Sequence, residues 1–213
     1  VQADIAAIFD SSSGKVVIAY KDGGNSGYGT AVVGTVSGTS ISFGTPVVFE
    51  TASCDAVGGT FDSTNNKVVL CYRDGGNSSY GTAIVGTVSG TSISFGTAVV
   101  YNSGTTTSQN AAFDSSNGKV VIGYRDSGNS GYATAIVGTV SGTTISFGSE
   151  VVFMSATGFA GAMTFDSTNN KVVFSMADTS DSSYGKAIVG TVSGTSISFG
   201  SLVTYENSGA ISG

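Results

Sequence analysis

Short apolar runs separated by turn-forming residues recur along the whole chain. The runs KVVIAY (Lys15–Tyr20) and TAVVGTV (Thr30–Val36) are apolar at most positions, whereas SISF (Ser40–Phe43) alternates polar and apolar residues. Runs this short, rich in β-branched side chains and bounded by Gly, Ser and Asn, predict β-strands and not helices. The first two runs predict strands buried on both faces, and the alternating run predicts a strand with one face in solvent.

One series of such strands is repeated four times with a period of 52 residues. The pair Phe-Asp recurs with its Phe at positions 9, 61, 113 and 165. The segment GTVSGTSISFG recurs at 34–44, 86–96 and 190–200, and with one change at 138–148. We interpret residues 1–213 as a single domain of four units, 1–52, 53–104, 105–156 and 157–208, followed by a tail, 209–213.

Each unit is expected to hold four strands. In the first unit these are Ile5–Phe9, Lys15–Tyr20, Thr30–Val36 and a fourth segment, Thr39–Phe49, with a bulge at Gly44, before a connector loop leads to the next unit. Strands buried on both faces need a sheet on each side, which identical units around an axis provide for one another. The predicted fold is all-β, a β-propeller of four four-stranded blades. Because four blades is the low end of the propeller range, part of a larger array and a ring closed by two copies remain alternatives.

Charged pairs flank the first tight turn of every unit. Asp10 opens this turn and Lys15 closes it, and the other units carry the same pair at 62 and 67, 114 and 119, and 166 and 171. We expect the aspartate to cap backbone amides of the turn and the lysine to be its cross-strand partner, so both are structural.

The loops between the second and third strands hold the candidate ligand-binding residues. Antiparallel strands place these loops and the connectors at one end of the sheets, and function concentrates on long loops. Planar polar groups, carboxylates and aromatic rings at one rim are suited to bind a sugar. Two alternatives remain: these residues cap backbone amides or form ion pairs between blades, or Asp and Asn ligate Ca²⁺, although the spacing D-x-x-N-S is sparse in acids. The candidates are Lys21, Asp22, Asn25, Tyr28, Arg73, Asp74, Asn77, Tyr80, Arg125, Asp126, Asn129, Tyr132, Asp178, Asp181 and Tyr184.

Composition excludes several classes of protein. The net charge is −6 without a basic cluster, so nucleic acid is not an expected partner. There is no apolar run of about 18 residues, so no membrane insertion is expected. There is no histidine, and we expect no catalytic triad, no zinc site and no cofactor. Cys54 and Cys71 are expected to be small buried side chains and not a disulfide.

The best case for an enzyme is a pair of unrepeated carboxylates. Asp4 and Asp55 lie in connectors and would point at the axis, as in a propeller glycoside hydrolase. Because a catalytic group is normally placed once, in an environment that shifts its pKa, the repeated acids argue against catalysis, and we do not expect the chain to be an enzyme.

The stretch FDSSNGKVVIGYRDSGNSGYATAIVGTVSGTTISFG (Phe113–Gly148) resembles a repeat of marine phage and bacterial proteins, most of them uncharacterised. The resemblance covers all four units, and the fourth departs most, at Met176-Ala177. It implies a propeller-like part of a surface or virion protein, such as a tail fibre. The expected function is non-enzymatic attachment at an extracellular or virion surface, with a glycan or surface protein as partner. A purely structural protein that forms a homo-oligomer or fibre is the first alternative, and the hydrolase is the second.

Overall fold

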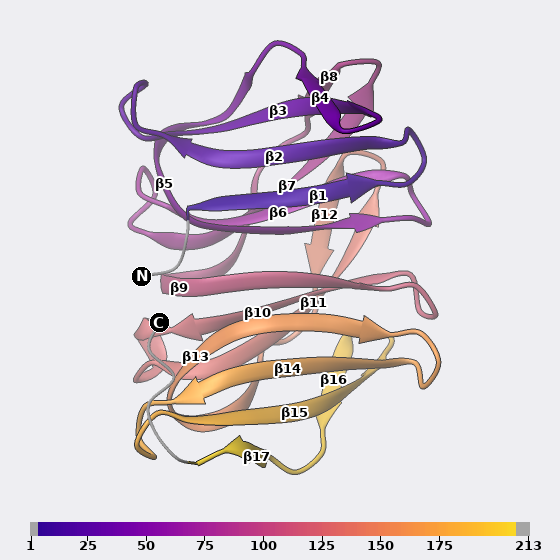
Figure 1. The fold of residues 1–213 in the computed structure, drawn as a ribbon. Coiled ribbons are helices and arrows are strands. Elements are labelled where there is room, and N and C mark those ends of the chain that lie inside the picture. The colour runs from indigo at the N-terminus through magenta and orange to yellow at the C-terminus, as the bar shows by residue number, and fades with distance from the viewer. Residues whose placement is uncertain (1–3, 208–213) are drawn as a thin grey trace.

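The structure, a computed structural model, describes residues 4–207, apart from the side chains of residues 157–160. The fold is all-β, as predicted, with one 3₁₀ turn, η1, and no α-helix within residues 4–207 (Figure 1). No helix able to cross a bilayer occurs in this part of the chain. The elements are β1 (Ile5–Asp10), β2 (Lys15–Asp22), β3 (Tyr28–Ser37), β4 (Ser40–Phe43), β5 (Val47–Asp62), β6 (Lys67–Asp74), β7 (Tyr80–Ser89), β8 (Ser92–Phe95), β9 (Val99–Asp114), β10 (Lys119–Asp126), η1 (Ser127–Asn129), β11 (Tyr132–Ser141), β12 (Thr144–Phe147), β13 (Val151–Asp166), β14 (Lys171–Asp178), β15 (Tyr184–Ser193), β16 (Ser196–Phe199) and β17 (Val203–Glu206).

The described strands form four antiparallel sheets, one for each unit of the sequence. In the first sheet β1 pairs with β2, β2 with β3, and β3 with both β4 and the first part of β5. Because β4 lies along the end of β3 and β5 along its start, the two share the outer position, with a break after Phe43 where a bulge was expected. The other three sheets repeat this order.

The connectors, which we predicted to be loops, are strands instead. β5, β9 and β13 each run for 16 residues from the outer edge of one sheet to the inner edge of the next. In β5, Ser53 pairs with Tyr28 of the first sheet and the following Cys54 pairs with Asp74 of the second. Because sheets on both sides satisfy its backbone hydrogen bonds, this segment is extended in spite of its Gly and Asp residues.

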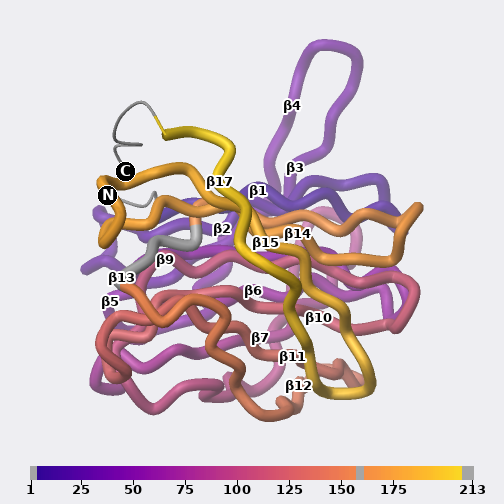
Figure 2. Tube along the Cα trace, turned by 90° about the horizontal axis from the view of Figure 1, so that it is seen from below, coloured from indigo at the N-terminus to yellow at the C-terminus, as the bar shows by residue number. Residues whose placement is uncertain are grey.

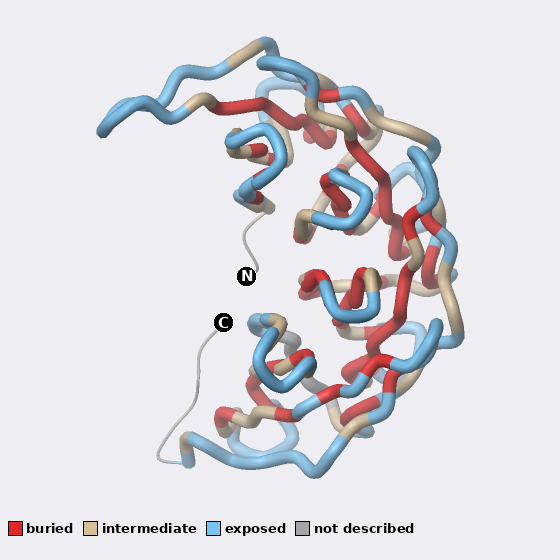
Figure 3. Tube along the Cα trace, turned by 90° about the vertical axis from the view of Figure 1, so that its right-hand side faces the viewer, coloured by how far each residue is buried: buried red, intermediate tan, exposed pale blue. Residues whose placement is uncertain are grey.

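The four sheets stand side by side in an arc that is open on one side (Figure 3). Hydrophobic clusters fill the junctions between consecutive sheets. At the first junction Val17 and Val33 of the first sheet pack with Leu70 and Ile84 of the second. β6 and β10, which have a sheet on each side, are buried along nearly their whole length, as their continuous apolar sequences predicted.

The aspartates cap the first tight turn of each unit, as predicted. Asp10 Oδ1 accepts hydrogen bonds from the backbone N–H groups of Ser12 and Ser13, at 2.9 and 3.1 Å. Asp62, Asp114 and Asp166 accept the equivalent pair of bonds. The turn ends in the left-handed conformation at Gly14 (φ +66°) and at Asn66 (φ +54°), which Gly and Asn adopt at low cost.

Each turn lysine stands opposite its aspartate in the strand register, as predicted, but the side chains of Lys15 and Lys119 bind a threonine and not the aspartate. Lys15 stands opposite Asp10 in the register, yet its Nζ donates to Thr35 Oγ1 of the third strand, at 2.9 Å. Lys119 donates in the same way to Thr139, at 3.0 Å. Both oxygens of Asp10 already accept bonds from the turn itself, so the lysine finds its acceptor one strand further along.

Consecutive sheets interlock through a glycine that follows each SISF strand. A Cβ on Gly44 would lie 1.9 Å from the carbonyl oxygen of Thr91, in the β7–β8 turn of the next sheet. The same contact joins Gly96 to Thr143 and Gly148 to Thr195. Since no side chain fits at that distance, glycine is required at these three junctions.

The two cysteines are free and buried, as predicted. Burial raises the pKa of the Cys71 thiol to about 12 and also raises that of Cys54, where Glu50 adds to the effect. Both thiols are therefore protonated at neutral pH and serve as small core side chains.

Candidate functional site: the loop end of the sheets

The loops between the second and third strands of the sheets lie at the same end as the middle parts of the long strands. We call this the loop end; it comprises residues 23–27, 75–79, 127–131 and 179–183 with the crossing parts of β5, β9 and β13, on the left in Figure 1. The opposite end, with the tight turns, is the turn end. Gly27 O accepts from Cys54 N, at 2.9 Å, and Ser53 O accepts from Gly75 N, at 2.8 Å. The crossing strand therefore joins the first loop to the second.

The repeated aspartates shape these loops. Asp74 Oδ1 accepts hydrogen bonds from the backbone N–H groups of Gly76 and Asn77, at 2.9 and 3.1 Å. Asp22, Asp126 and Asp178 each accept one backbone N–H of their own loop, at 3.0 to 3.1 Å. These four candidates are thus capping residues, the first of the two alternatives for the loops.

The exposed surface of the loop end is formed by the other candidates. Asn25, Asn77, Asn129 and Asp181 are exposed, and Tyr28, Tyr80, Tyr132 and Tyr184 are half-buried. A backbone hydrogen bond of 3.0 Å links Tyr28 N to Asn25 O, and the second and fourth loops repeat this link. Every loop therefore carries an exposed Asn or Asp three residues before a half-buried tyrosine.

The cations of the first two loops are both paired with one aspartate of β5, Lys21 from the first sheet and Arg73 from the second. Asp55 of β5 accepts from Lys21 Nζ at 2.5 Å and from Arg73 Nη2 at 2.8 Å. Burial opposes ionisation of Asp55, but the hydrogen bonds from these two cations keep its pKa below the ordinary value. Lys21 thus forms the ion pair between units that the first alternative included, whereas Arg73 pairs with Asp55 inside its own unit.

The fourth loop neutralises its own charges through a residue that sequence analysis missed. Lys186 Nζ lies 2.7 Å from Asp178 Oδ2 and 2.8 Å from Asp181 Oδ2. The equivalent positions in the other units are threonines, Thr30, Thr82 and Thr134. The same unit carries Ala177 in place of Lys or Arg, and Asp181 in place of Asn. These three simultaneous changes were the available signal that the cation had moved within the loop.

The third loop keeps its cation without an acid. Arg125 corresponds to Lys21 and Arg73, but its neighbour across the strand pair is Thr107, at the place that Asp55 takes one unit earlier. No carboxylate of the described residues pairs with Arg125, and its buried Nε lacks a hydrogen-bond partner there. Among the described residues of the loop end, Arg125 is therefore the cation without a carboxylate partner.

A polar hollow of about 240 Å³ borders the same loop. Asn102 Nδ2 donates to Asp126 Oδ2 at 3.1 Å and to Glu150 Oε1 at 2.9 Å. The hollow is lined by Asn102, Ser103, Gly104, Asp126, Gly128 and Asn129. Two of the candidates, Asp126 and Asn129, thus border an open, shallow hollow.

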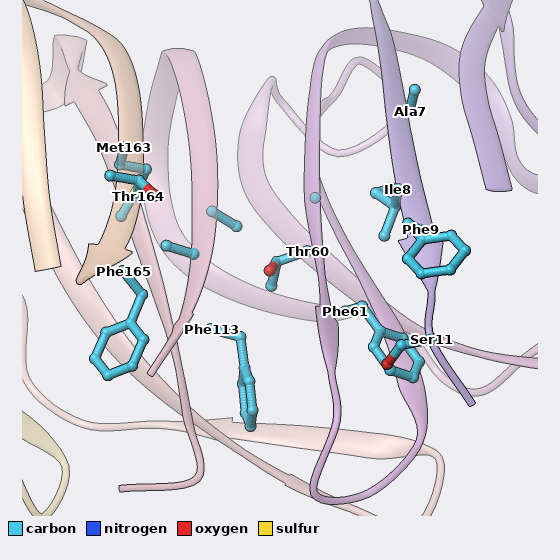
Figure 4. A pocket seen from close by; sticks show the side chains of 13 residues that line it. Ala7, Ile8, Phe9, Ser11, Thr60, Phe61, Phe113, Met163, Thr164 and Phe165 are labelled. Carbon is cyan, nitrogen blue, oxygen red and sulfur yellow. The ribbon is translucent and has the colours of Figure 1, made fainter. Parts of the chain in front are cut away.

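A second hollow, of about 520 Å³, follows the inner strands (Figure 4). Its described lining carries no charge and consists of four phenylalanines, Ile8, Met163 and small or hydroxyl residues; the phenylalanines are Phe9, Phe61, Phe113 and Phe165. Asp4 and Asp55, the candidate axial pair, are not part of this lining. Asp4 Oδ1 accepts the N–H of Ala56, at 2.6 Å, and Asp55 is bound by two cations. The structure therefore does not place Asp4 and Asp55 as a pair of free carboxylates in this hollow.

The loop end offers amide, carboxylate and guanidinium groups beside half-buried aromatic rings. This chemistry suits a ligand rich in hydroxyl groups, since polar groups fix its orientation and a ring covers its apolar face. No protein-family model matches the chain, and a search of the curated proteins finds no match.

Proposed function

We propose that the chain is a non-enzymatic attachment module that holds a glycan at its loop end, on a virion or cell surface. The observation that carries this proposal is the row of four loops with the same aspartate cap, each with an exposed Asn or Asp three residues before a half-buried Tyr. Several weak sites on one body raise the overall affinity for a ligand that itself repeats, such as a polysaccharide.

We also propose that the four sheets are blades of a propeller-like fold. The arc of sheets in Figure 3, and the strands that pass from the outer edge of one sheet to the inner edge of the next, support this arrangement. The loop end is then one rim of the propeller, and its loops face the same direction.

The third loop is the proposed principal contact. Arg125 has no acid partner among the described residues, and Asn129 borders the polar hollow. A sugar with a carboxylate or sulfate group would supply the anion that Asp55 supplies at the first junction, through a charge-assisted hydrogen bond.

The test is an array of neutral and acidic glycans, read with and without Ca²⁺. We expect a subset of glycans to bind, and acidic ones to be favoured. The triple variant Asn25→Ala, Asn77→Ala, Asn129→Ala removes three exposed amides and should weaken binding by about tenfold or more. Arg125→Gln should weaken binding of acidic glycans alone.

The matched control is Ser37→Ala, Ser89→Ala, Ser141→Ala, which changes three exposed residues at the turn end. It should bind as the unmodified chain does, and circular dichroism should show native sheet in both triple variants. A blank array under both conditions would contradict the proposal, and full binding by the loop variant would remove the loop end from it.

A further inference from the structure

The first sheet exposes a face that is buried in the other three. Ile41 is 44% exposed, whereas its equivalents Ile93, Ile145 and Ile197 are 2–3% exposed. Val36 and Phe43 are also more than half exposed, and their β3–β4 hairpin projects from the body of the molecule (Figure 2). We call this surface the head face; it consists of Val16, Ile18, Tyr20, Val36, Ile41 and Phe43.

The fourth sheet exposes the opposite face. Val189 is 44% exposed, while its equivalents Val33, Val85 and Val137 are fully buried. Tyr205 is 56% exposed, against 6–9% for Phe49, Tyr101 and Phe153. We call this surface the tail face; it consists of Val173, Ser175, Ala187, Val189, Val203 and Tyr205.

Inside the chain, a head face always packs on a tail face. At the first junction, Ile93 from the head side of the second sheet shares a cluster with Val33 and Phe49 from the tail side of the first. Ring contacts repeat this relation, with centroid distances of 5.4 Å for Phe49–Phe95, 5.7 Å for Tyr101–Phe147 and 5.0 Å for Phe153–Phe199. The next pair in this series is Tyr205 with Phe43, and these two rings do not meet within one chain because the arc is open (Figure 3).

We propose that a second copy of the chain covers both faces, so that each head face packs on the partner's tail face and the two arcs close one ring. A head face is complementary to a tail face and not to another head face, so the interface is head-to-tail. Two such interfaces related by a rotation close the two chains into a ring. Two copies supply eight sheets, the upper end of the usual range for propellers, whereas three would exceed it. Ring formation is independent of glycan binding at the loop end.

A polar contact of the first junction has its counterpart in the proposed interface. Tyr72 Oη donates to Glu50 Oε2 across the first junction, at 3.1 Å. At the third junction the same two positions are Met176 and Met154, which share an apolar cluster. The tail face ends at Glu206, at the position of Glu50, and the head face carries Tyr20, at the position of Tyr72. The head and the tail therefore carry the Tyr and the Glu of the first junction, and not one residue from that polar pair with one from the apolar pair of the third junction.

Gly200 lacks, within one chain, the threonine contact that the equivalent glycines make. Gly44, Gly96 and Gly148 each lie against a threonine carbonyl of the next sheet, where a Cβ would approach to 1.9 Å. A Cβ on Gly200 would meet only Val189 O, at 3.8 Å. The equivalent threonine for Gly200 is Thr39, in the head-face turn of the second copy. Gly200 is therefore a position where a methyl group is harmless to one chain and incompatible with the ring.

The first test is the mass in solution, by light scattering coupled to gel filtration over a range of concentrations. We expect a plateau at twice the 21.1 kDa of one chain. Gly200→Ala should halve this mass while the thermal unfolding of the chain remains cooperative. Ser201→Ala, at an exposed neighbouring residue, is the matched control and should keep the double mass.

The second test blocks one face at a time. Ile41→Lys blocks the head and Val203→Lys blocks the tail, and each variant alone should be monomeric. An equimolar mixture should recover a species of double mass, because one intact head and one intact tail remain. A head-to-head or tail-to-tail dimer would instead leave one of the single variants dimeric.

Three outcomes would overturn the proposal. The unmodified chain could have the mass of one chain at every concentration it reaches. Its mass could rise with concentration without a plateau, which indicates an open fibre. Gly200→Ala could keep the double mass, which would place the interface elsewhere.

Discussion

The turn end and the loop end of the sheets carry equally repeated aspartates in different surroundings. At the turn end, Asp10, Asp62, Asp114 and Asp166 all accept the same two backbone bonds. At the loop end the caps also recur, but the cations around them do not: two loops share Asp55, one uses Lys186, and the third leaves Arg125 without an acid in the described chain. Local backbone geometry thus keeps the turns alike, while contacts between units allow the loops to differ.

The comparison predicts that the turn end tolerates change least. Gly96→Ala would place its Cβ 1.9 Å from Thr143 O, where the second sheet meets the third. We expect the free energy of unfolding to fall by about 3 kcal/mol, because the adjoining sheets must separate. Urea unfolding in the Gly200→Ala background, where one chain unfolds alone, measures the loss. Ser94→Ala, on the exposed face of the same strand, is the control, and an equal loss in both would refute the interlocking role of Gly96.

The two kinds of aspartate cap should differ in strength. Asp114 is fully buried and accepts from Ser116 N, Asn117 N and Asn117 Nδ2, so Asp114→Ala should cost about 2 kcal/mol. Asp22 accepts one exposed bond, from Gly24 N, and Asp22→Ala should cost about 0.5 kcal/mol. The two variants are compared by urea unfolding. Equal losses would mean that the loop end is held as firmly as the turn end.

The fourth loop should lose stability when its cation is removed and regain part of it when one of its two paired carboxylates is also removed. Lys186→Thr restores the residue of the other units but leaves Asp178 and Asp181 without their cation. We expect a loss of about 1.5 kcal/mol, between the values typical of exposed and buried pairs. Adding Asp181→Asn should recover part of it. If the second change deepens the loss, repulsion between the two carboxylates is not its cause.

The ion pair at Asp55 should give a small loss of stability with a characteristic pH dependence. Asp55→Asn weakens the contacts of Lys21 and Arg73, at an expected cost of about 1 kcal/mol at pH 7. Because the pKa of Asp55 in the folded chain lies below its ordinary value of 3.8, its contribution is complete above that pH. It is lost as the pH falls through the folded pKa, so the two unfolding curves should converge in acid. A difference that does not shrink as the pH falls below 3.8 would exclude the ion pair as its cause.

Sequence predicted the strands well because their determinants are local. The β-branched runs, the turn aspartates and the left-handed Gly14 and Asn66 depend on neighbours within a few residues. The connectors were predicted wrongly because ETASCDAVGG (Glu50–Gly59) carries the composition of a loop. Its extended conformation depends on pairing with two sheets, which no local window contains.

The candidate loops were placed at one end by strand alternation, but the partner of each side chain was not predictable from one unit. Lys15 was assigned to the nearest acid in the register, and it contacts Thr35 because Asp10 is already saturated. Lys186 was overlooked because it interrupts a repeat instead of continuing it. A search for the positions at which one unit departs from the others would have found both ion-paired loops.

The long strands β5, β9 and β13 have a mechanical consequence. Each pairs through backbone hydrogen bonds with one sheet along its first part and with the following sheet along its second part. Tension along the chain would load these hydrogen-bond ladders in shear. Neighbouring sheets should therefore resist separation, whereas domains joined by a flexible linker separate easily. A domain built in this way should transmit a pulling force from one end to the other with little extension.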